Sequence, residues 1–149
     1  MGLVSTMSKE PKEFPTIEGR YQMTKTWSIN LPERYQRRFA DGNMALSRPG
    51  MTHWLAVWNF GEDQTAESTL SWIKRDKPQE IAQEFEPNRS GYRCWGYLQL
   101  EQTDQAARWA FYSYTIGRTG YVQMATYLDD QKDLEKVLSI WNSLSEQAA

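Results

Sequence analysis

The sequence predicts an α+β fold in which helices pack on an antiparallel sheet of about six to seven strands. Two observations in the last third of the chain carry this prediction. Strand-like runs follow one another with short polar turns between them, which is typical of an antiparallel meander. An amphipathic helix then closes the chain, because apolar side chains recur there at helical spacing. The runs span residues 92–101, 106–116 and 121–128, and the helix spans residues 130–144.

The composition indicates one folded domain. The chain has 149 residues, of which 40% are hydrophobic and 24% are charged, which is typical of a soluble, globular protein with a sizeable core. Residues 1–19 are polar and contain Pro11 and Pro15, so we expect a flexible leader there. Residues 20–149 are predicted to form a single α+β domain.

Charge and hydropathy exclude several classes of protein. The net charge of −2 disfavours nucleic-acid binding, which needs a basic surface. No apolar run approaches the roughly 20 residues of a membrane-spanning helix. The first residues lack the pattern of a signal peptide, so we expect a cytoplasmic protein. A single cysteine excludes an intramolecular disulfide framework.

The first half of the chain predicts a strand and a hairpin. Tyr21, Met23, Trp27 and Ile29 alternate with polar residues, which indicates a half-buried strand, and Pro32 is expected to end it. Residues 34–48 predict a hairpin, because the sequence Asp-Gly-Asn at residues 41–43 suits a tight turn.

The middle of the chain predicts a central strand, a helix and an edge strand. Residues 52–60 are apolar at both parities, which indicates a strand covered on both faces. Residues 64–75 predict a helix that Asp63 or Thr65 caps, with Ala66, Leu70 and Ile73 on one apolar stripe. Residues 79–86 are expected to form an edge strand with three outward glutamates.

Strand parity in the meander divides its side chains between two faces. In the first strand Cys94, Leu98 and Leu100 share one face, whereas Trp95 and Tyr97 share the other. The first face is expected to meet the closing helix. The stripe of that helix consists of Leu134, Val137, Leu138, Trp141 and Leu144. The second face is either covered by the helix at residues 64–75 or free to bind a partner.

Aromatic residues are the strongest functional signal. The chain contains 7 Trp, 8 Tyr and 5 Phe, more than a small core obviously needs. Three such rings left exposed would form a patch of about several hundred Å², the size that marks a binding surface. The candidates for one sheet face are Trp54, Trp58, Trp95, Tyr97, Tyr112 and Tyr114.

A second candidate site is the arginine-rich hairpin. Arg34, Arg37, Arg38 and Arg48 make it locally basic, and Arg37 and Arg38 are our candidates for contact with a partner. The simpler interpretation is a solvated edge strand on which cationic side chains prevent edge-to-edge pairing.

Catalytic and metal-binding groups are sparse. His53 and Cys94 are the only histidine and the only cysteine, and each has apolar same-face neighbours, so we interpret both as structural. Glu80, Glu84 and Glu86 lack the apolar surroundings that would raise a carboxyl pKa. We therefore predict no enzyme activity, no cofactor and no metal.

Three stretches resemble the Mog/PsbP-like α/β/α sandwich superfamily: residues 27–32 as its opening strand, residues 44–58 as its hairpin and long strand, and residues 129–144 as its closing helix. Members of this superfamily are mostly non-enzymatic, so the resemblance implies a protein without enzyme activity. The alternative fold is a START-like helix grip. The two differ in the closing helix, which lies flush on the sheet in the first and stands off a ligand cavity in the second.

These observations predict a non-enzymatic binding or adaptor module that engages a protein partner through the aromatic face or the arginine-rich hairpin. The alternative function is a carrier that holds a small apolar ligand between the sheet and the C-terminal helix.

Overall fold

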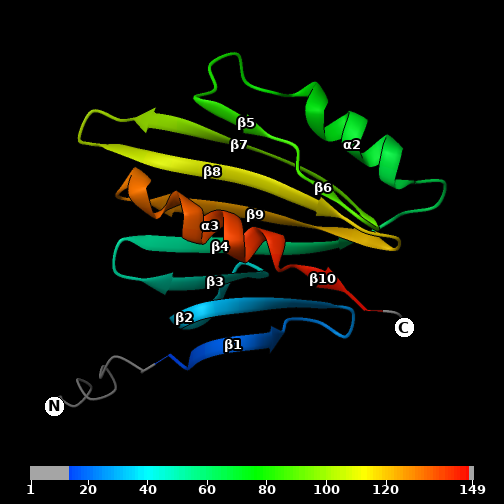
Figure 1. The fold of residues 1–149 in the computed structure, drawn as a ribbon, viewed down its shortest axis with the longest axis horizontal. Coiled ribbons are helices and arrows are strands. Elements are labelled where there is room, and N and C mark those ends of the chain that lie inside the picture. Colours follow the sequence, from blue (N-terminus) through cyan, green and yellow to red (C-terminus); the bar gives the residue numbers. More distant parts are fainter. Residues whose placement is uncertain (1–13, 148–149) are drawn as a thin grey trace, which may run out of the picture.

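A computed structural model describes residues 14–147, which build one antiparallel sheet with a helix on each face (Figure 1). The order of strands across this ten-stranded sheet is β1-β2-β3-β4-β9-β8-β7-β5, with β10 beside β2 and β6 beside β7. The bounds are β1 (Thr16–Gln22), β2 (Trp27–Ala40), β3 (Asn43–Arg48), β4 (Met51–Asn59), α2 (Ala66–Arg75), β5 (Gln83–Phe85), β6 (Asn88–Arg89), β7 (Tyr92–Gln102), β8 (Ala107–Ile116), β9 (Gly120–Leu128), α3 (Leu134–Asn142) and β10 (Ser145–Glu146).

The antiparallel sheet is confirmed, but the predicted fold class is wrong. Within residues 14–147 the sheet has ten strands, and the two α-helices have only 10 and 9 residues. Such short helices do not form layers, so the fold is dominated by sheet and is not the α/β/α sandwich of the Mog/PsbP-like superfamily. The START-like alternative is wrong too, because the short α3 lies flush on the sheet instead of being wrapped by it.

The N-terminal part of the sheet differs from the prediction. Residues 16–29 form two strands, and Tyr21 pairs with Ile29 across the β1–β2 hairpin. Because β1 begins at Thr16, the predicted leader extended too far, and its residues 1–13 lie outside the described part of the chain. Pro32 does not end β2, because the β1–β2 pairing is irregular between Leu31 and Tyr35 and no ladder bond needs its missing N–H.

The predicted hairpin turn and central strand are confirmed. Ala40 pairs with Asn43, and the two turn residues Asp41 and Gly42 both have positive φ, as a type I′ turn requires. β4 pairs with β3 on one side and with β9 on the other. It is therefore central, which explains why both of its faces carry apolar side chains.

The main core lies between the sheet and α3, which crosses one face of the sheet in Figure 1. Val137, Trp141 and Leu144 of the predicted helical stripe are buried there, and so is Ile140, which the predicted stripe did not include. They contact strand residues from β2 to β7, among them Phe111, whose ring centroid lies 5.3 Å from that of Trp141.

The opposite face carries α2, but only at one end. Leu70 and Ile73 pack with Trp95, Ile116 and Tyr121 in a second, smaller core. The Thr65 hydroxyl accepts a hydrogen bond from the Ser68 N–H at 3.0 Å, and the Ser68 hydroxyl accepts one from the Thr65 N–H at the same distance. These two bonds form a capping box. The rest of this face, over β4, β9 and β8, has no helix of the described chain on it.

The short strand β10 was missed by the sequence analysis, and it fastens the end of the described chain to two distant elements. Glu146 pairs with Trp27 of β2, and its carboxylate accepts bonds from the N–H groups of Arg118 and Thr119 at 2.7 and 2.9 Å. These hydrogen bonds hold the β8–β9 turn against the β2 side of the molecule.

Candidate functional site

The sheet register brings all six predicted aromatic residues onto the face opposite α3. Trp95 pairs with Tyr114, and Tyr97 pairs with Tyr112 across β7 and β8. Residues that pair directly share a face, so the rows continue through β9 to Trp54 on β4. We call this surface the aromatic face; its members are Trp54, Trp58, Trp95, Tyr97, Tyr112, Tyr114, Tyr121 and Tyr127.

Ring contacts connect five of these side chains into one network: Trp95, Tyr97, Tyr112, Tyr114 and Tyr127. The ring centroids are 5.2 Å apart for Trp95 and Tyr97, 5.4 Å for Tyr97 and Tyr112, and 6.2 Å for Tyr112 and Tyr127. Tyr114 stacks on Trp95 with an angle of 14° between the ring planes. Because the rings stand on four hydrogen-bonded strands, the face is a rigid platform.

The helix α2 covers only part of the aromatic face. Trp95 lies beneath the helix and is only 1% exposed, so it supports the face and offers no surface. Its indole Nε1–H donates to Glu84 at 2.6 Å, and Lys77 also bonds Glu84, at 2.9 Å. Trp54, Tyr97, Tyr112 and Tyr114 remain half-buried.

An open groove runs between α2 and the uncovered part of the aromatic face. Trp58 from β4 is 49% exposed, and Trp72 from α2 is 52% exposed, and both line it. Its volume is about 660 Å³, within the range of ligand and peptide sites. A Cβ at Gly120 would collide with the Trp58 carbonyl, so glycine there lets β9 approach Trp58 closely. Other residues that line this aromatic groove include Tyr97, Tyr114, Tyr121, Gln123, Asn59, Asp76 and Lys77.

The polar groups of the groove are neutral hydrogen-bonding groups for the most part. Burial, together with the charges of Tyr114 and Glu101, raises the pKa of Tyr97 to about 12. Burial likewise raises the pKa of Tyr114 and of Tyr121 above the ordinary tyrosine value. The hydroxyls therefore stay protonated at neutral pH, and with the amide of Gln123 they can both donate and accept.

Two arginines stack on the aromatic face. The Arg38 guanidinium carbon lies 5.1 Å from the Trp54 ring centroid, and that of Arg108 lies 3.9 Å from the Tyr127 centroid. Arg108 also pairs with Glu101, which in turn accepts a hydrogen bond from Tyr112. Stacked guanidinium groups extend the planar surface and add donors at its margin.

The arginine-rich hairpin does not form one site. Arg37 lies on the α3 side of the sheet and donates to the Tyr21 hydroxyl at 2.9 Å. Arg48 is partly buried and pairs with Glu33 at 2.7 Å. Arg34 is exposed near Glu18 on β1. Of the two predicted contact residues, only Arg38 joins the aromatic face.

Sequence reasoning missed Trp72, Tyr121 and Tyr127 as members of the site. Trp72 lies just outside the buried stripe of its helix, and only the position of α2 on the sheet turns it toward the groove. Tyr121 and Tyr127 lie on the same face of β9, and the alternation of side chains along that strand could have identified both of them. Their pairing with β4 and β8, which the structure supplies, is what places them beside the predicted residues.

His53 and Cys94 are kept apart by the sheet. His53 is on β4 and Cys94 is on β7, and β9 and β8 lie between these two strands. Three strand spacings, about 14 Å in all, therefore separate the backbone of β4 from that of β7. His53 is buried with Nδ1 2.7 Å from the Thr126 hydroxyl, and burial raises the pKa of the Cys94 thiol. Residues 14–147 contain no group of three or more His, Cys, Asp or Glu side chains placed to hold a metal ion.

Comparisons with known proteins identify a fold and no family. No protein-family model and no curated protein matches the chain. A crystal structure of a protein from Bacteroides thetaiotaomicron at 1.50 Å resolution is similar, with a TM-score of 0.68 and 9% sequence identity over 89% of this chain. The match covers 50% of that protein, so the present chain spans about half its length. Neither helix of the described chain is long and apolar enough to cross a membrane.

Proposed function

We propose that this protein is a binding module that holds a protein partner on the aromatic face, with a segment of the partner in the aromatic groove. One observation carries the proposal: Trp58 and Trp72, from two separate elements, are both about half exposed beside a rigid tyrosine floor. A single exposed tryptophan is normal on a protein surface, whereas neighbouring exposed apolar side chains mark an interaction site. Two that line one groove form a site.

The composition of the surface favours a protein over a small molecule. Trp, Tyr and Arg are the residues that dominate the energetic centres of protein interfaces. The aromatic face supplies all three, since Arg38 and Arg108 stack on its rings. It also continues from the groove across β8 and β9 to Trp54 on β4, which is a larger area than a small ligand would cover.

The carrier function that the sequence also suggested has less support. It places a ligand between the sheet and the C-terminal helix. Val137, Ile140 and Leu144 are fully buried at that interface, and the Phe111 and Trp141 rings meet edge to face. Side chains of the protein itself occupy the position that the ligand would take.

The test compares three proteins: the wild type, the double variant Trp58→Ala/Trp72→Ala, and the control Phe39→Ala. Phe39 is 65% exposed and lies on the sheet face opposite the aromatic face, so its removal deletes an exposed ring without touching the groove. A partner captured by the wild type is purified and titrated against each protein by calorimetry.

The proposal expects equal affinity for the wild type and Phe39→Ala. The double variant should bind at least about a hundredfold more weakly, since two interface tryptophans contribute about 3 kcal/mol or more together. Equal affinity for all three proteins would contradict the proposal. So would native mass spectrometry that finds a small molecule in the wild type and not in the double variant.

A further inference from the structure

The aromatic groove holds hydrogen-bond donors that the chain itself does not use. Each of the following side chains lines the groove and carries one O–H or N–H donor: Tyr97, Tyr114, Tyr121, Trp58 and Trp72. None of these donors has an acceptor in the part of the chain that the structure describes, whereas Trp95 donates to Glu84 and Tyr112 donates to Glu101. The groove therefore suits an occupant that is rich in hydrogen-bond acceptors.

Unused donors beside flat rings favour a proline-rich segment. Proline has no N–H group, so such a segment presents carbonyl acceptors and few donors. It adopts the polyproline II helix, whose carbonyls have no internal partner, and grooves lined by aromatic rings are the usual sites for it. An α-helix would use its carbonyls internally. An added strand would need the edge of the sheet, whereas this groove lies on its face.

Asp76 adds a negative charge at the C-terminal end of α2. It lines the groove four residues after Trp72, and residues at this spacing are neighbours on one side of a helix. Within residues 14–147 its carboxylate has no ion pair, and the next residue, Lys77, pairs with Glu84 at 2.9 Å. Burial is the main cause of the raised pKa of Tyr114, and the charge of Asp76 adds to it, which places this carboxylate beside the groove floor.

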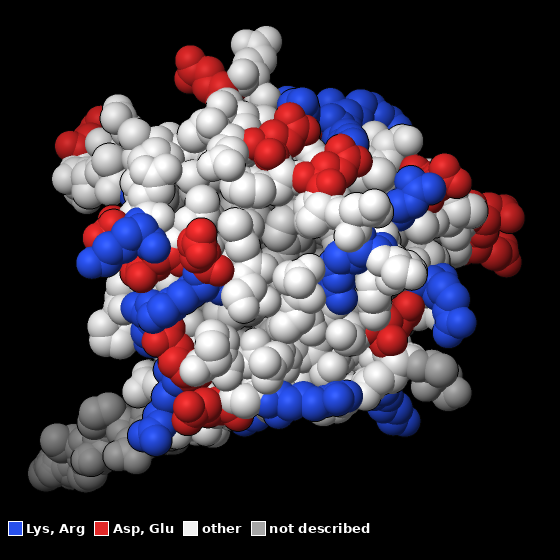
Figure 2. Space-filling model, viewed as in Figure 1, with Lys and Arg blue, Asp and Glu red and all other residues white. Residues whose placement is uncertain are grey.

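Other charges of the molecule leave Asp76 without a partner. On the α3 side, where blue and red side chains alternate along the left margin of Figure 2, Glu33 pairs with both Arg48 and Lys136. The arginines that stack on the aromatic face are on β2 and β8, over Trp54 and Tyr127, and do not line the groove. An unpaired carboxylate next to a tryptophan ring attracts a cationic side chain.

We propose that the aromatic groove binds a proline-rich segment of the partner in the polyproline II conformation, with one lysine or arginine side chain of that segment beside Asp76 and Trp72. This inference rests on the proposed function, because it names the kind of segment that the partner places in the groove. The proline rings pack on Trp58, Trp72 and Tyr114, and the hydroxyl and indole donors bind the carbonyls of the segment.

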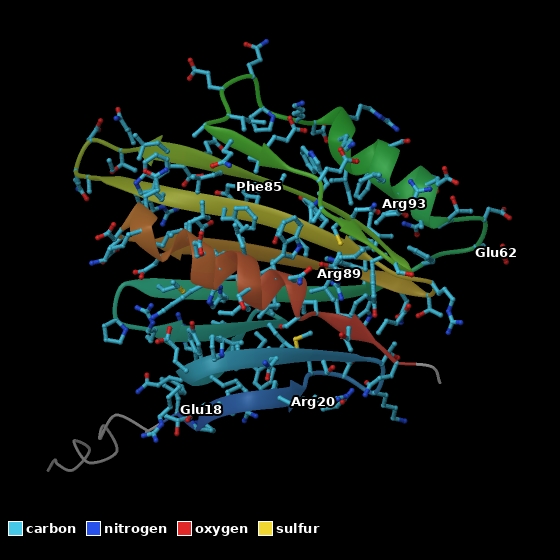
Figure 3. The ribbon with its side chains drawn as sticks, viewed as in Figure 1. Glu18, Arg20, Glu62, Phe85, Arg89 and Arg93 are labelled. Atoms are coloured by element: carbon cyan, nitrogen blue, oxygen red, sulfur yellow. The ribbon has the colours of Figure 1, made fainter. Side chains whose placement is uncertain are left out.

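The experiment uses three synthetic peptides of equal length. The first is proline-rich and has one arginine, the second has glutamine in place of that arginine, and the third keeps the arginine but has alanine in place of every proline. Calorimetry titrates each peptide against the wild type, Trp58→Ala/Trp72→Ala, Asp76→Asn and the control Glu18→Gln. Glu18 lies on β1, at the edge of the sheet far from α2, as Figure 3 shows, so its variant makes the same charge change away from the groove.

We expect the first peptide to bind the wild type and Glu18→Gln equally, and the double tryptophan variant at least about tenfold more weakly. The alanine peptide should bind the wild type about tenfold more weakly, because it loses more conformational freedom and brings unpaired N–H groups. The glutamine peptide should bind the wild type about threefold more weakly than the first, as the loss of an exposed ion pair predicts. In Asp76→Asn the first and second peptides should bind equally.

Equal binding of the proline and alanine peptides by the wild type, or absence of saturable binding of the first peptide, would overturn the inference. So would an unchanged effect of the arginine in Asp76→Asn. If the captured partner loses affinity for the double tryptophan variant while no peptide binds, the proposed function stands and this inference fails. Sedimentation that finds a dimer of the wild type and a monomer of the double variant would assign the groove to a second copy and overturn the inference too. Urea unfolding of each variant checks that the fold is intact.

Discussion

His53 is an uncharged histidine in the middle of the main core. It is fully buried, and its Nε2 has no hydrogen-bond partner within the described chain. Burial, with a smaller contribution from the positive charge of Arg48, lowers the pKa of His53 from 6.5 to about 3. In the unfolded chain the same imidazole titrates near its ordinary value. Between these two pKa values only the unfolded state binds the proton, so acid favours unfolding.

We therefore predict that the free energy of unfolding falls as the pH is lowered below 6.5, by up to about 1.4 kcal/mol per pH unit. Urea unfolding between about pH 5 and about pH 7 measures the slope. Carboxyl groups with lowered pKa values, such as that of Glu33, add most of their effect below about pH 5. Because the chain has one histidine, His53→Asn should remove most of the slope. A slope that persists in this variant would show that another group causes it.

Cys94 is a packed thiol. It is buried in the main core, and burial raises its pKa above the ordinary value of 9.0. Only the thiolate reacts, so we predict that iodoacetamide modifies the folded protein at least about a hundredfold more slowly than the urea-unfolded chain. Mass spectrometry at timed intervals measures both rates. Comparable rates would mean that this part of β7 opens readily, and that the thiol is available for chemistry.

At the scale of elements, the strongly periodic segments were predictable and the weakly patterned ones were not. The meander and the apolar stripe of α3 follow from local sequence, because each repeats its apolar residues at the period of its own element. The Asp41-Gly42 turn also follows from local sequence, because these residue types tolerate the positive φ that the turn requires. β10 has two residues and β6 has two, so neither carries a period. Pro32 misled the prediction because its effect depends on the pairing irregularity in β2, which is not local information.

The candidate sites show the same limit. Strand parity predicted that Tyr97, Tyr112 and Tyr114 share a face, since alternation along a strand is a local property. It could not show that α2 would cover Trp95 and leave Trp58 exposed. Nor could it show that Trp72 of α2 would line the same groove as Trp58.

The capping box of α2 offers a test of how firmly that helix is held on the sheet. Thr65→Ala removes a side-chain acceptor for the Ser68 N–H and should lower the free energy of unfolding by about 1 kcal/mol. Ser71→Ala, at an exposed position of the same helix, should change it by about 0.5 kcal/mol or less. Urea unfolding compares the two variants. Equal effects would mean that packing of Leu70 and Ile73 alone determines the stability of the helix.

The whole molecule divides its aromatic residues between two tasks. Several on the α3 side, among them Trp27 and Phe111, are fully buried and hold the sheet to the helix. On the other side Trp95 and Tyr121 are buried near α2, and the remaining rings are half-buried or exposed on strands that are already hydrogen-bonded to their neighbours. If the aromatic face exists for binding, its exposed rings should contribute little to folding. A comparison of two tryptophans, one from each face, separates these tasks.

Trp141 of α3 is 3% exposed, whereas Trp58 of β4 is 49% exposed. Trp141→Ala leaves a cavity in the main core and should reduce the free energy of unfolding by about 3–5 kcal/mol. Trp58→Ala removes a ring that already contacts water, and should reduce it by less than about 1 kcal/mol. Urea unfolding at one pH measures both. A loss at Trp58 as large as that at Trp141 would mean that the aromatic face is a second core, and the proposed partner site would lose its basis. A small loss leaves Trp58 without a structural task, which is the condition that a residue kept for binding must meet.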